Sequence, residues 1–197
     1  SLSPQYDYRS NVGVISVAAA FLMKENFQLM KSWDMAVTAY NSGTKHLLKT
    51  KRELASTKND INLEAIIKHS DSQHFGFASK NFYSEFLALV HALAYEEELF
   101  ANIHRDDRYN VEDDLDFYLM KCALSPDKVL DKDQMDDVLY YNHHIILPKN
   151  SYPRGTIITS KEKLPSSKFL KLSLNQIVKS KPKDWNMFLQ NQSCSTK

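Results

Sequence analysis

A short run of the chain, AYNSG at residues 39–43, places hydrogen-bonding groups directly after an apolar helical stretch. A tyrosine hydroxyl and an asparagine amide can each donate and accept hydrogen bonds, so this pair could serve a polar ligand. The same residues also suit the end of a helix, because Gly43 can adopt the positive φ that terminates helices. The helix-end interpretation explains Gly43 fully and Asn41 in part, but it leaves the aromatic hydroxyl of Tyr40 unexplained.

The sequence contains no motif for binding a nucleotide, a metal ion or nucleic acid. The four glycines form no phosphate-binding loop, so we expect no nucleotide and no other cofactor. Cys122 and Cys194 lack metal-ligand spacing, and one bridge between them is possible in an oxidising compartment. His143 and His144 are adjacent and point in different directions, which disfavours a shared metal. The net charge of +1 argues against a nucleic-acid partner.

The elements that must position these residues are mainly helices. The 197 residues suit one domain of moderate size, or one domain with an appendage. Spacing of apolar residues predicts helices over residues 12–30 and 33–41, from Thr44, from Asn62, and from Phe82 to about Ile103. The stretch Val12 to Met23 is apolar on nearly every side, which predicts a helix inside a bundle, and it is too short to span a bilayer.

The pattern changes after the charged stretch 104–114, which we interpret as a linker. LDFYLMKCAL, from residue 115, is short and apolar enough for a strand, and SPDKVL has a proline at a first helical position. DKDQMDDVLYYN predicts a short amphipathic helix and PRGTIITSK a strand. Residues 115–165 therefore predict a small α+β module, and residues 166–197 a tail with one or two short helices and a disordered end.

Three segments resemble a known family, in the right order over about a hundred residues. AVTAYNSG resembles the AYNAG motif of the lysozyme-like lytic transglycosylases of bacterial cell walls. DYRSNVGVISVAAAFL resembles the Asp-x-Arg turn and Ala-rich helix upstream of it, with Asp7 and Arg9 in the matching positions. FASKNFYSEFLALVHAL resembles the segment that carries an aromatic residue into the cleft, with Asn81 and Phe82 at the matching positions. The resemblance implies a mainly α fold with a lysozyme-like helical lobe over residues 1–103.

The second module resembles the region that follows the catalytic domain in membrane-bound lytic transglycosylases of the D type. That region has a LysM-like order of strand, two helices and strand, and Asn142 falls where an Asn ends the second helix. The usual Gly-Asp-Thr-Leu turn is replaced by Ser125, Pro126 and Asp127.

The resemblance implies cleavage of the β-1,4 bond between MurNAc and GlcNAc, with a 1,6-anhydro product and no cofactor. One Glu acts as acid and then as base in this family, and it belongs to a Glu-Ser pair that the printed sequence lacks. We therefore expect no catalytic residue in this chain. The substrate-binding residues that the resemblance implies are Tyr40, Asn41, Ser42, Asn81 and Phe82, with Phe82 as an apolar wall or a plain core residue.

Three hypotheses remain open at this point. The chain is part of a lytic transglycosylase whose acid lies outside it, an inactive relative that binds peptidoglycan or a protein partner through the same cleft, or a helical interaction module. The first two imply a periplasmic or envelope location. Because residues 12–30 are apolar all round, we expect the chain to dimerise or to associate with a missing N-terminal segment.

Overall fold

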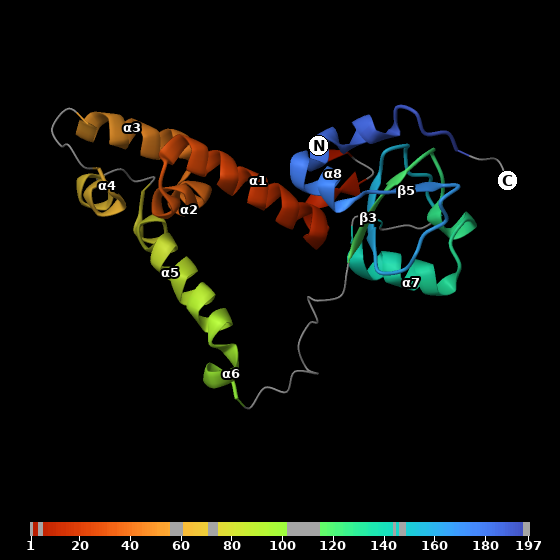
Figure 1. The fold of residues 1–197 in the computed structure, drawn as a ribbon, viewed down its shortest axis with the longest axis horizontal. Helices are drawn as coiled ribbons and strands as arrows, with labels where there is room; N and C mark the ends of the chain where they lie inside the picture. The colour runs from red at the N-terminus through yellow and green to blue at the C-terminus, as the bar shows by residue number, and fades with distance from the viewer. Residues whose placement is uncertain are drawn as a thin grey trace. The chain divides into compact units, whose positions relative to one another are not determined.

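The computed structural model is mainly helical and describes residues 2–3, 6–55, 61–70, 75–101, 115–143, 145 and 149–194 (Figure 1). Its contacts divide the chain into two compact units. A helical unit holds Ala20–Tyr109, and a C-terminal unit joins Ser1–Ala19 to Asn110–Lys197. The predicted linker 104–114, the predicted helix end near Ile103 and His144 lie outside the described residues.

Most helices of the first hundred residues begin and end close to where the sequence predicts them, but the helix predicted from Phe82 to about Ile103 begins at Phe77 and ends at Ala94, where Tyr95 separates it from a short further helix. Asn62 caps one of them by accepting a hydrogen bond from the backbone N–H of Ala65 at 2.9 Å. These helices are α1 (Val12–Met30), α2 (Trp33–Ser42), α3 (Thr44–Ala55), α4 (Leu63–His69), α5 (Phe77–Ala94) and the short α6 (Glu96–Leu99).

The core of the helical unit forms where α2, α3 and α4 meet the end of α1. Its largest fully buried side chains are Met30, Leu47, Ile66 and Phe75. Asn26 of α1 is buried beside this core, and both ends of its amide are bonded: its Nδ2 donates to the Ala36 carbonyl at 3.2 Å, and its Oδ1 accepts from the Thr44 hydroxyl at 2.8 Å. One buried amide therefore ties α1, α2 and α3 together.

Two apolar helices are exposed, so the prediction of a buried bundle helix is wrong for α1. Only 11% of its most apolar window is buried. Leu89 and Leu93 of α5 are 60% and 64% exposed, because α5 packs on α2 and on short α6, which cover only part of it. Within the described residues, α1 is also the one helix long and apolar enough to cross a membrane, a test of length and composition that helices of soluble proteins can pass too.

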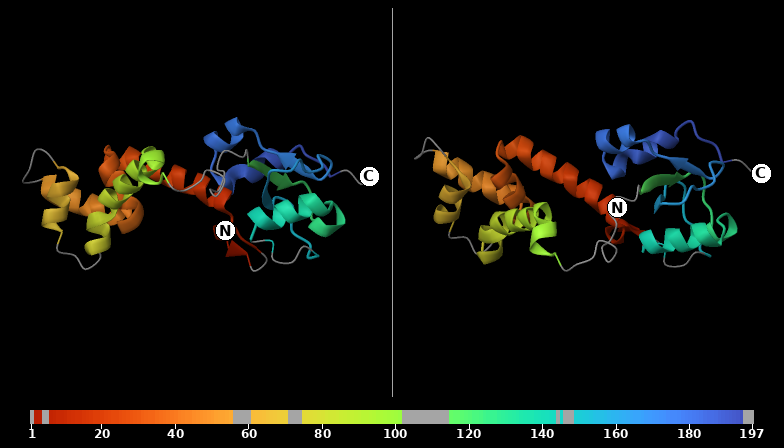
Figure 2. Two further views of the ribbon diagram at one scale, coloured as in Figure 1. Left: turned by 90° about the horizontal axis from the view of Figure 1, so that it is seen from below. Right: turned by 60° about the horizontal axis from the view of Figure 1, so that its bottom comes forward.

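The C-terminal unit is built on an antiparallel sheet of strand order β4-β3-β5. Figure 2 shows α7 on one side of this sheet and α8 with the 3-10 helix η4 on the other. The strands and helices are β3 (Asp116–Met120), η3 (Pro126–Lys128), α7 (Lys132–Tyr141), β4 (Ile157–Ser160), β5 (Phe169–Lys171), α8 (Leu174–Lys179) and η4 (Pro182–Leu189).

Covering both faces of the sheet explains why the central strand reads as a continuous apolar run. Tyr118 and Met120 pack in one cluster with Val138 of α7. Phe117 and Leu119 face the other way and pack in a second cluster, which contains the fully buried Trp185 of η4. Alternate residues of a strand point to opposite faces, so a strand covered on both sides needs apolar residues throughout.

The first residues of the chain belong to this C-terminal unit, and the predicted domain 1–103 is wrong in its first part. The short strand β2 (Tyr6–Asp7) pairs with β1 (Leu2–Ser3). Asp7 then caps the 3-10 helix η1 (Tyr8–Ser10) and forms an ion pair with Arg9, so the predicted Asp-x-Arg turn is present. Tyr8 accepts a hydrogen bond from the backbone N–H of Ile157 at 3.0 Å. This hydrogen bond joins residues 149 positions apart in the sequence and holds the first segment of the chain on the C-terminal unit.

A buried polar network fixes the start of α1 on the module. Asn11 accepts a hydrogen bond from the N–H of Val14 at 2.9 Å, and its Nδ2 donates to Asn142 Oδ1 at 2.8 Å. Asn142 Oδ1 also accepts from the N–H of Thr159 at 2.8 Å, and all three polar residues are fully buried. A Cβ on Gly13 would approach the side chains of Phe117 and Thr159 to 3.1 Å, which is tighter than most such contacts, so a larger residue here would require these side chains to shift.

The predicted tail is an integral part of the C-terminal unit. It supplies strand β5 as well as two short helices, where one or two were predicted, and Cys194 near its end forms a disulfide with Cys122. The Arg154 guanidinium donates to the carbonyls of Lys121 and Leu189 at 2.9 and 2.6 Å. The prediction of a disordered end is therefore wrong as far as residue 194.

Candidate functional site

The motif that opens the sequence analysis lies at the end of α2. Gly43 has φ of 84° and its N–H donates to the Ala39 carbonyl at 2.9 Å, so it terminates the helix as predicted. Tyr40 is 40% exposed and Asn41 is exposed beside it. Among the described residues, the Asn41 side chain makes no hydrogen bond to the end of its own helix, so the helix-end interpretation explains Gly43 alone.

The start of α5 packs against this helix end and brings the two motif segments together. The Ser79 hydroxyl donates to Asn41 Oδ1 at 3.0 Å across 38 residues of sequence. The rings of Tyr40 and Phe82 are stacked, with centroids 6.4 Å apart and planes inclined by 21°. Tyr40, Asn41, Ser79 and Phe82 therefore form one group of neighbouring side chains, which we call the α2–α5 site.

Two of the predicted site residues use their side chains on their own helices. Ser42 Oγ donates to the Thr38 carbonyl at 3.0 Å, and Asn81 Nδ2 donates to the Phe77 carbonyl at 3.0 Å. Such bonds one turn back along a helix are local and satisfy the polar group without a ligand. The structure bonds Ser42 and Asn81 to their own helices and to no other member of the group, and their role as ligand contacts stays a prediction.

Ser79 is the member of the α2–α5 site that sequence analysis missed. It stands three residues before Phe82 on the same helix, and residues three apart share a helix face. That spacing could have pointed to it once Phe82 was singled out. A lone serine carries no signal of its own, however, and its partner on α2 follows only from the fold.

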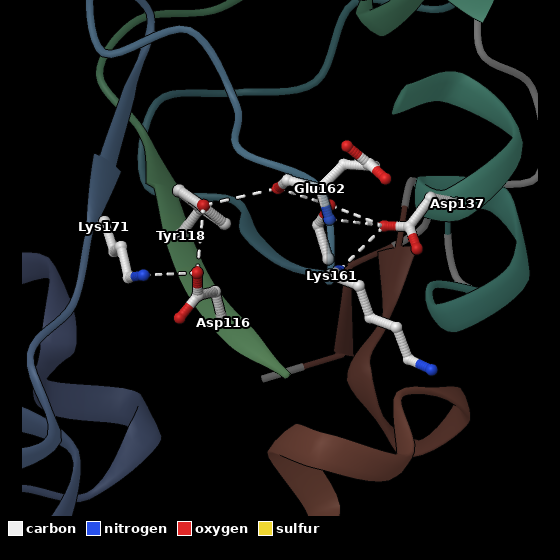
Figure 3. Close-up of polar contacts among 7 residues, drawn as sticks. Asp116, Tyr118, Asp137, Lys161, Glu162 and Lys171 are labelled. Atoms are coloured by element: carbon white, nitrogen blue, oxygen red, sulfur yellow. Dashed lines mark hydrogen bonds and ion pairs between the residues drawn. The ribbon is translucent and has the colours of Figure 1, made fainter. Parts of the chain in front are cut away.

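A second polar cluster lies in the C-terminal unit, around the end of β4 (Figure 3). Asp137 Oδ2 accepts hydrogen bonds from the Ser160 hydroxyl at 2.6 Å and from the Lys161 N–H at 3.0 Å. The carboxylate thus holds the turn that follows the strand. Both donors bind the same carboxylate oxygen, Oδ2, and such an arrangement is typical of a side chain that caps a turn.

Tyr118 and Asp116 complete this cluster from β3. The Tyr118 hydroxyl lies 3.3 Å from Asp116 Oδ2 and 3.3 Å from the Glu162 carbonyl, and Lys171 forms an ion pair with Asp116. Burial raises the pKa of the Tyr118 hydroxyl above its ordinary value, a backbone hydrogen bond from Leu164 opposes the shift, and the charge of Asp116 adds to it. The tyrosine is therefore held in its neutral form.

In the part of the chain that the structure describes, no carboxylate makes a hydrogen bond to a member of the α2–α5 site. Glu85 is exposed farther along α5, and Glu97 and Glu98 are exposed on α6. Among the described residues, no three His, Cys, Asp or Glu side chains lie close enough to hold a metal ion.

Comparisons with known proteins add no assignment. No family model, curated protein or solved structure matches the chain.

Proposed function

We propose that the chain binds the glycan strands of peptidoglycan through the α2–α5 site and is part of a lytic transglycosylase. The observation that carries the proposal is the meeting of two separate motif segments at that site. Tyr40 and Asn41 come from the AYNSG segment, and Phe82 comes from the segment that the resemblance expects beside it. Two motifs named from sequence alone have adjacent side chains, as a shared binding site requires.

The chemistry of the site suits a sugar. The partly exposed rings of Tyr40 and Phe82 offer apolar surface to the C–H face of a pyranose, while the Tyr40 hydroxyl and the Asn41 amide offer hydrogen bonds to its polar edge. The printed sequence contains no Glu-Ser pair, so in this proposal the acid comes from a segment outside it. That Glu protonates the leaving oxygen and then, as base, takes the proton of the substrate's own 6-hydroxyl as this oxygen attacks the anomeric carbon.

The disulfide between Cys122 and Cys194 supports an oxidising location, such as the periplasm, because disulfides persist there. This agrees with a function on the cell wall.

The test is co-sedimentation of the full chain with purified peptidoglycan sacculi. We expect Tyr40→Ala and Phe82→Ala each to weaken binding at least about fivefold, or about 1 kcal/mol. Tyr95→Ala is the matched control, because Tyr95 is an exposed aromatic residue on the same unit outside the site. Unchanged binding by both site variants would contradict the proposal. Mass spectrometry of the digest is expected to show no 1,6-anhydro product from the chain alone.

A second candidate function is a helical interaction module with no glycan role, such as a subunit that dimerises. The exposed apolar side chains of α5, Leu89 and Leu93 among them, favour it. Sedimentation velocity over a range of protein concentrations tests this second function. If the chain dimerises through α5, Leu89→Lys should change its oligomeric state. The same variant should leave glycan binding unchanged, because Leu89 lies outside the α2–α5 site.

A further inference from the structure

The stretch from Lys163 to Lys183 carries a strong local charge. It contains six lysines and no aspartate or glutamate, in a chain whose net charge is only +1. This stretch supplies β5, α8 and the start of η4, and α8 and η4 lie on one side of the sheet of the C-terminal unit (Figure 2). We call the surface formed by α8 and η4 the basic face.

The charge of the basic face is only partly neutralised within the unit. Lys171 of β5 forms an ion pair with Asp116, whereas no described acidic side chain pairs with Lys179 or Lys183, both of which are exposed. The other side of the sheet is acidic, because residues 126–137 of η3 and α7 hold five aspartates and two lysines. An anionic surface therefore attracts the C-terminal unit and orients it with the basic face inward.

Large apolar side chains are exposed among these lysines. Leu174 is 74% exposed, Val178 is 52% exposed and Met187 is 49% exposed. Leu174 and Val178 stand four residues apart on α8, so they share a face of that helix. Ile177, beside them, packs against the core cluster that contains Trp185. This contact anchors α8 and keeps the apolar side chains directed outward.

Lysines and aliphatic side chains together fit the surface of an anionic lipid bilayer. The ammonium groups bind lipid phosphates, while the aliphatic side chains enter the boundary of the acyl layer. The methylene stem of lysine lets its ammonium group reach the phosphates from an inserted helix. A soluble polyanion would neutralise the lysines but would leave the aliphatic side chains in water. We propose that the basic face docks the chain on a bilayer that contains anionic phospholipids. This goes beyond the glycan-binding function proposed above and does not depend on it.

The experiment is co-sedimentation of the full chain with sucrose-loaded vesicles of two compositions. One contains phosphatidylcholine alone, and the other contains phosphatidylcholine and phosphatidylglycerol in equal amounts. We expect the chain to partition at least about tenfold more strongly onto the anionic vesicles at low ionic strength. This preference should fall as salt is added, because salt screens the attraction between lysines and phosphates.

Matched variants locate the contact on the molecule. The double variant Lys179→Gln and Lys183→Gln should lower partitioning onto anionic vesicles about tenfold. The control is Lys128→Gln with Lys132→Gln, which removes the same charge from η3 and α7 and should stay within a factor of about two. Leu174→Gln should weaken partitioning about fivefold, through the lost burial of its aliphatic side chain.

The outcomes decide both the surface and its partner. Equal partitioning onto the two kinds of vesicle, or equal losses in the two lysine pairs, overturns the proposal. Binding of the chain to poly-L-glutamate but to neither kind of vesicle would assign the basic face to an acidic protein and would overturn it as well. All five substituted side chains are exposed, so each variant should keep the melting temperature of the unaltered chain, which circular dichroism checks.

Discussion

The C-terminal unit and the helical unit use their polar side chains in opposite ways. In the C-terminal unit, Asn11, Asn142 and Thr159 are fully buried and satisfy one another. In the helical unit, Asn41 and Tyr40 are exposed, and only one end of the Asn41 amide is used. Buried polar groups that are fully paired specify a fold, whereas positioned polar groups at a surface are available to a ligand.

The two units also differ in how their apolar residues are covered. The central strand β3 is buried on both faces, and a disulfide closes the C-terminal unit. Helix α5 keeps large apolar side chains in water beyond its contact with α2. The C-terminal unit thus buries the apolar residues of its central strand and is closed by a disulfide, whereas the helical unit leaves the apolar surface of α5 exposed, which agrees with the proposal that glycan binding takes place on the helical unit.

The largest expected effect is loss of the disulfide. Replacing Cys122 and Cys194 with serine opens a loop of 72 residues, which should cost about 4 kcal/mol in the free energy of unfolding. Urea unfolding, monitored by hydrogen exchange in each unit, should show this loss of stability in the C-terminal unit alone. An equal loss in the helical unit would break the distinction between the units.

The next effect comes from the buried network. Asn142→Ala leaves the amide of Asn11 and the N–H of Thr159 without this partner, and should destabilise the C-terminal unit by about 3 kcal/mol. Asn175→Ala, an exposed change on α8, is the control and should stay within about 0.5 kcal/mol. A shift in the melting temperature that is the same for both variants would contradict the structural role of the network.

A smaller effect concerns alkaline pH. Because burial raises the pKa of Tyr118 above its ordinary value of 10.0, folding favours the neutral hydroxyl. The stability that it contributes is fully present below pH 10 and is lost as the pH rises through the higher folded pKa. Urea titrations between pH 8 and pH 11 should therefore show a steeper loss in the unaltered chain than in Tyr118→Phe. Identical slopes would place Tyr118 in a solvated environment.

The smallest expected change in stability is that of Tyr40→Phe. The ring still stacks on Phe82, and the lost hydroxyl is at an exposed position, so the free energy of unfolding should change by less than about 0.5 kcal/mol. In a complete enzyme, the same change should lower turnover about tenfold to a hundredfold through the loss of one hydrogen bond in a partly dry site. Turnover that stays within a factor of about two would show that the hydroxyl has no catalytic part.

Local patterns in the sequence predicted the helices well because their signals are local. The predicted bounds of α1 agree with the structure, Asn62 caps α4 as expected, and Gly43 ends α2. The sequence analysis missed strand β5 because three residues are too few to show the alternation of apolar and polar side chains that marks a strand. The contact between Asn11 and Asn142 spans 131 residues, and no local pattern encodes it.

The candidate site was also predicted only in part, because local motifs indicate single residues and not the contacts between distant segments. Tyr40, Asn41 and Phe82 were found from motifs, and the structure brings them together. Ser42 and Asn81 share those motifs, but the direction of a side chain depends on its rotamer and its neighbours, and theirs bond to their own helices. Ser79 depends on the packing of α5 against α2, which only the three-dimensional structure supplies.

Hydrogen exchange of the full chain with and without chitotetraose tests most directly whether the helical unit is the one that binds glycan. We predict that the sugar slows exchange at the end of α2 and in the first turns of α5, with no change from residue 115 to residue 194. Slower exchange confined to residues 115–194, or none anywhere at saturating sugar, would contradict the assignment of glycan binding to the α2–α5 site.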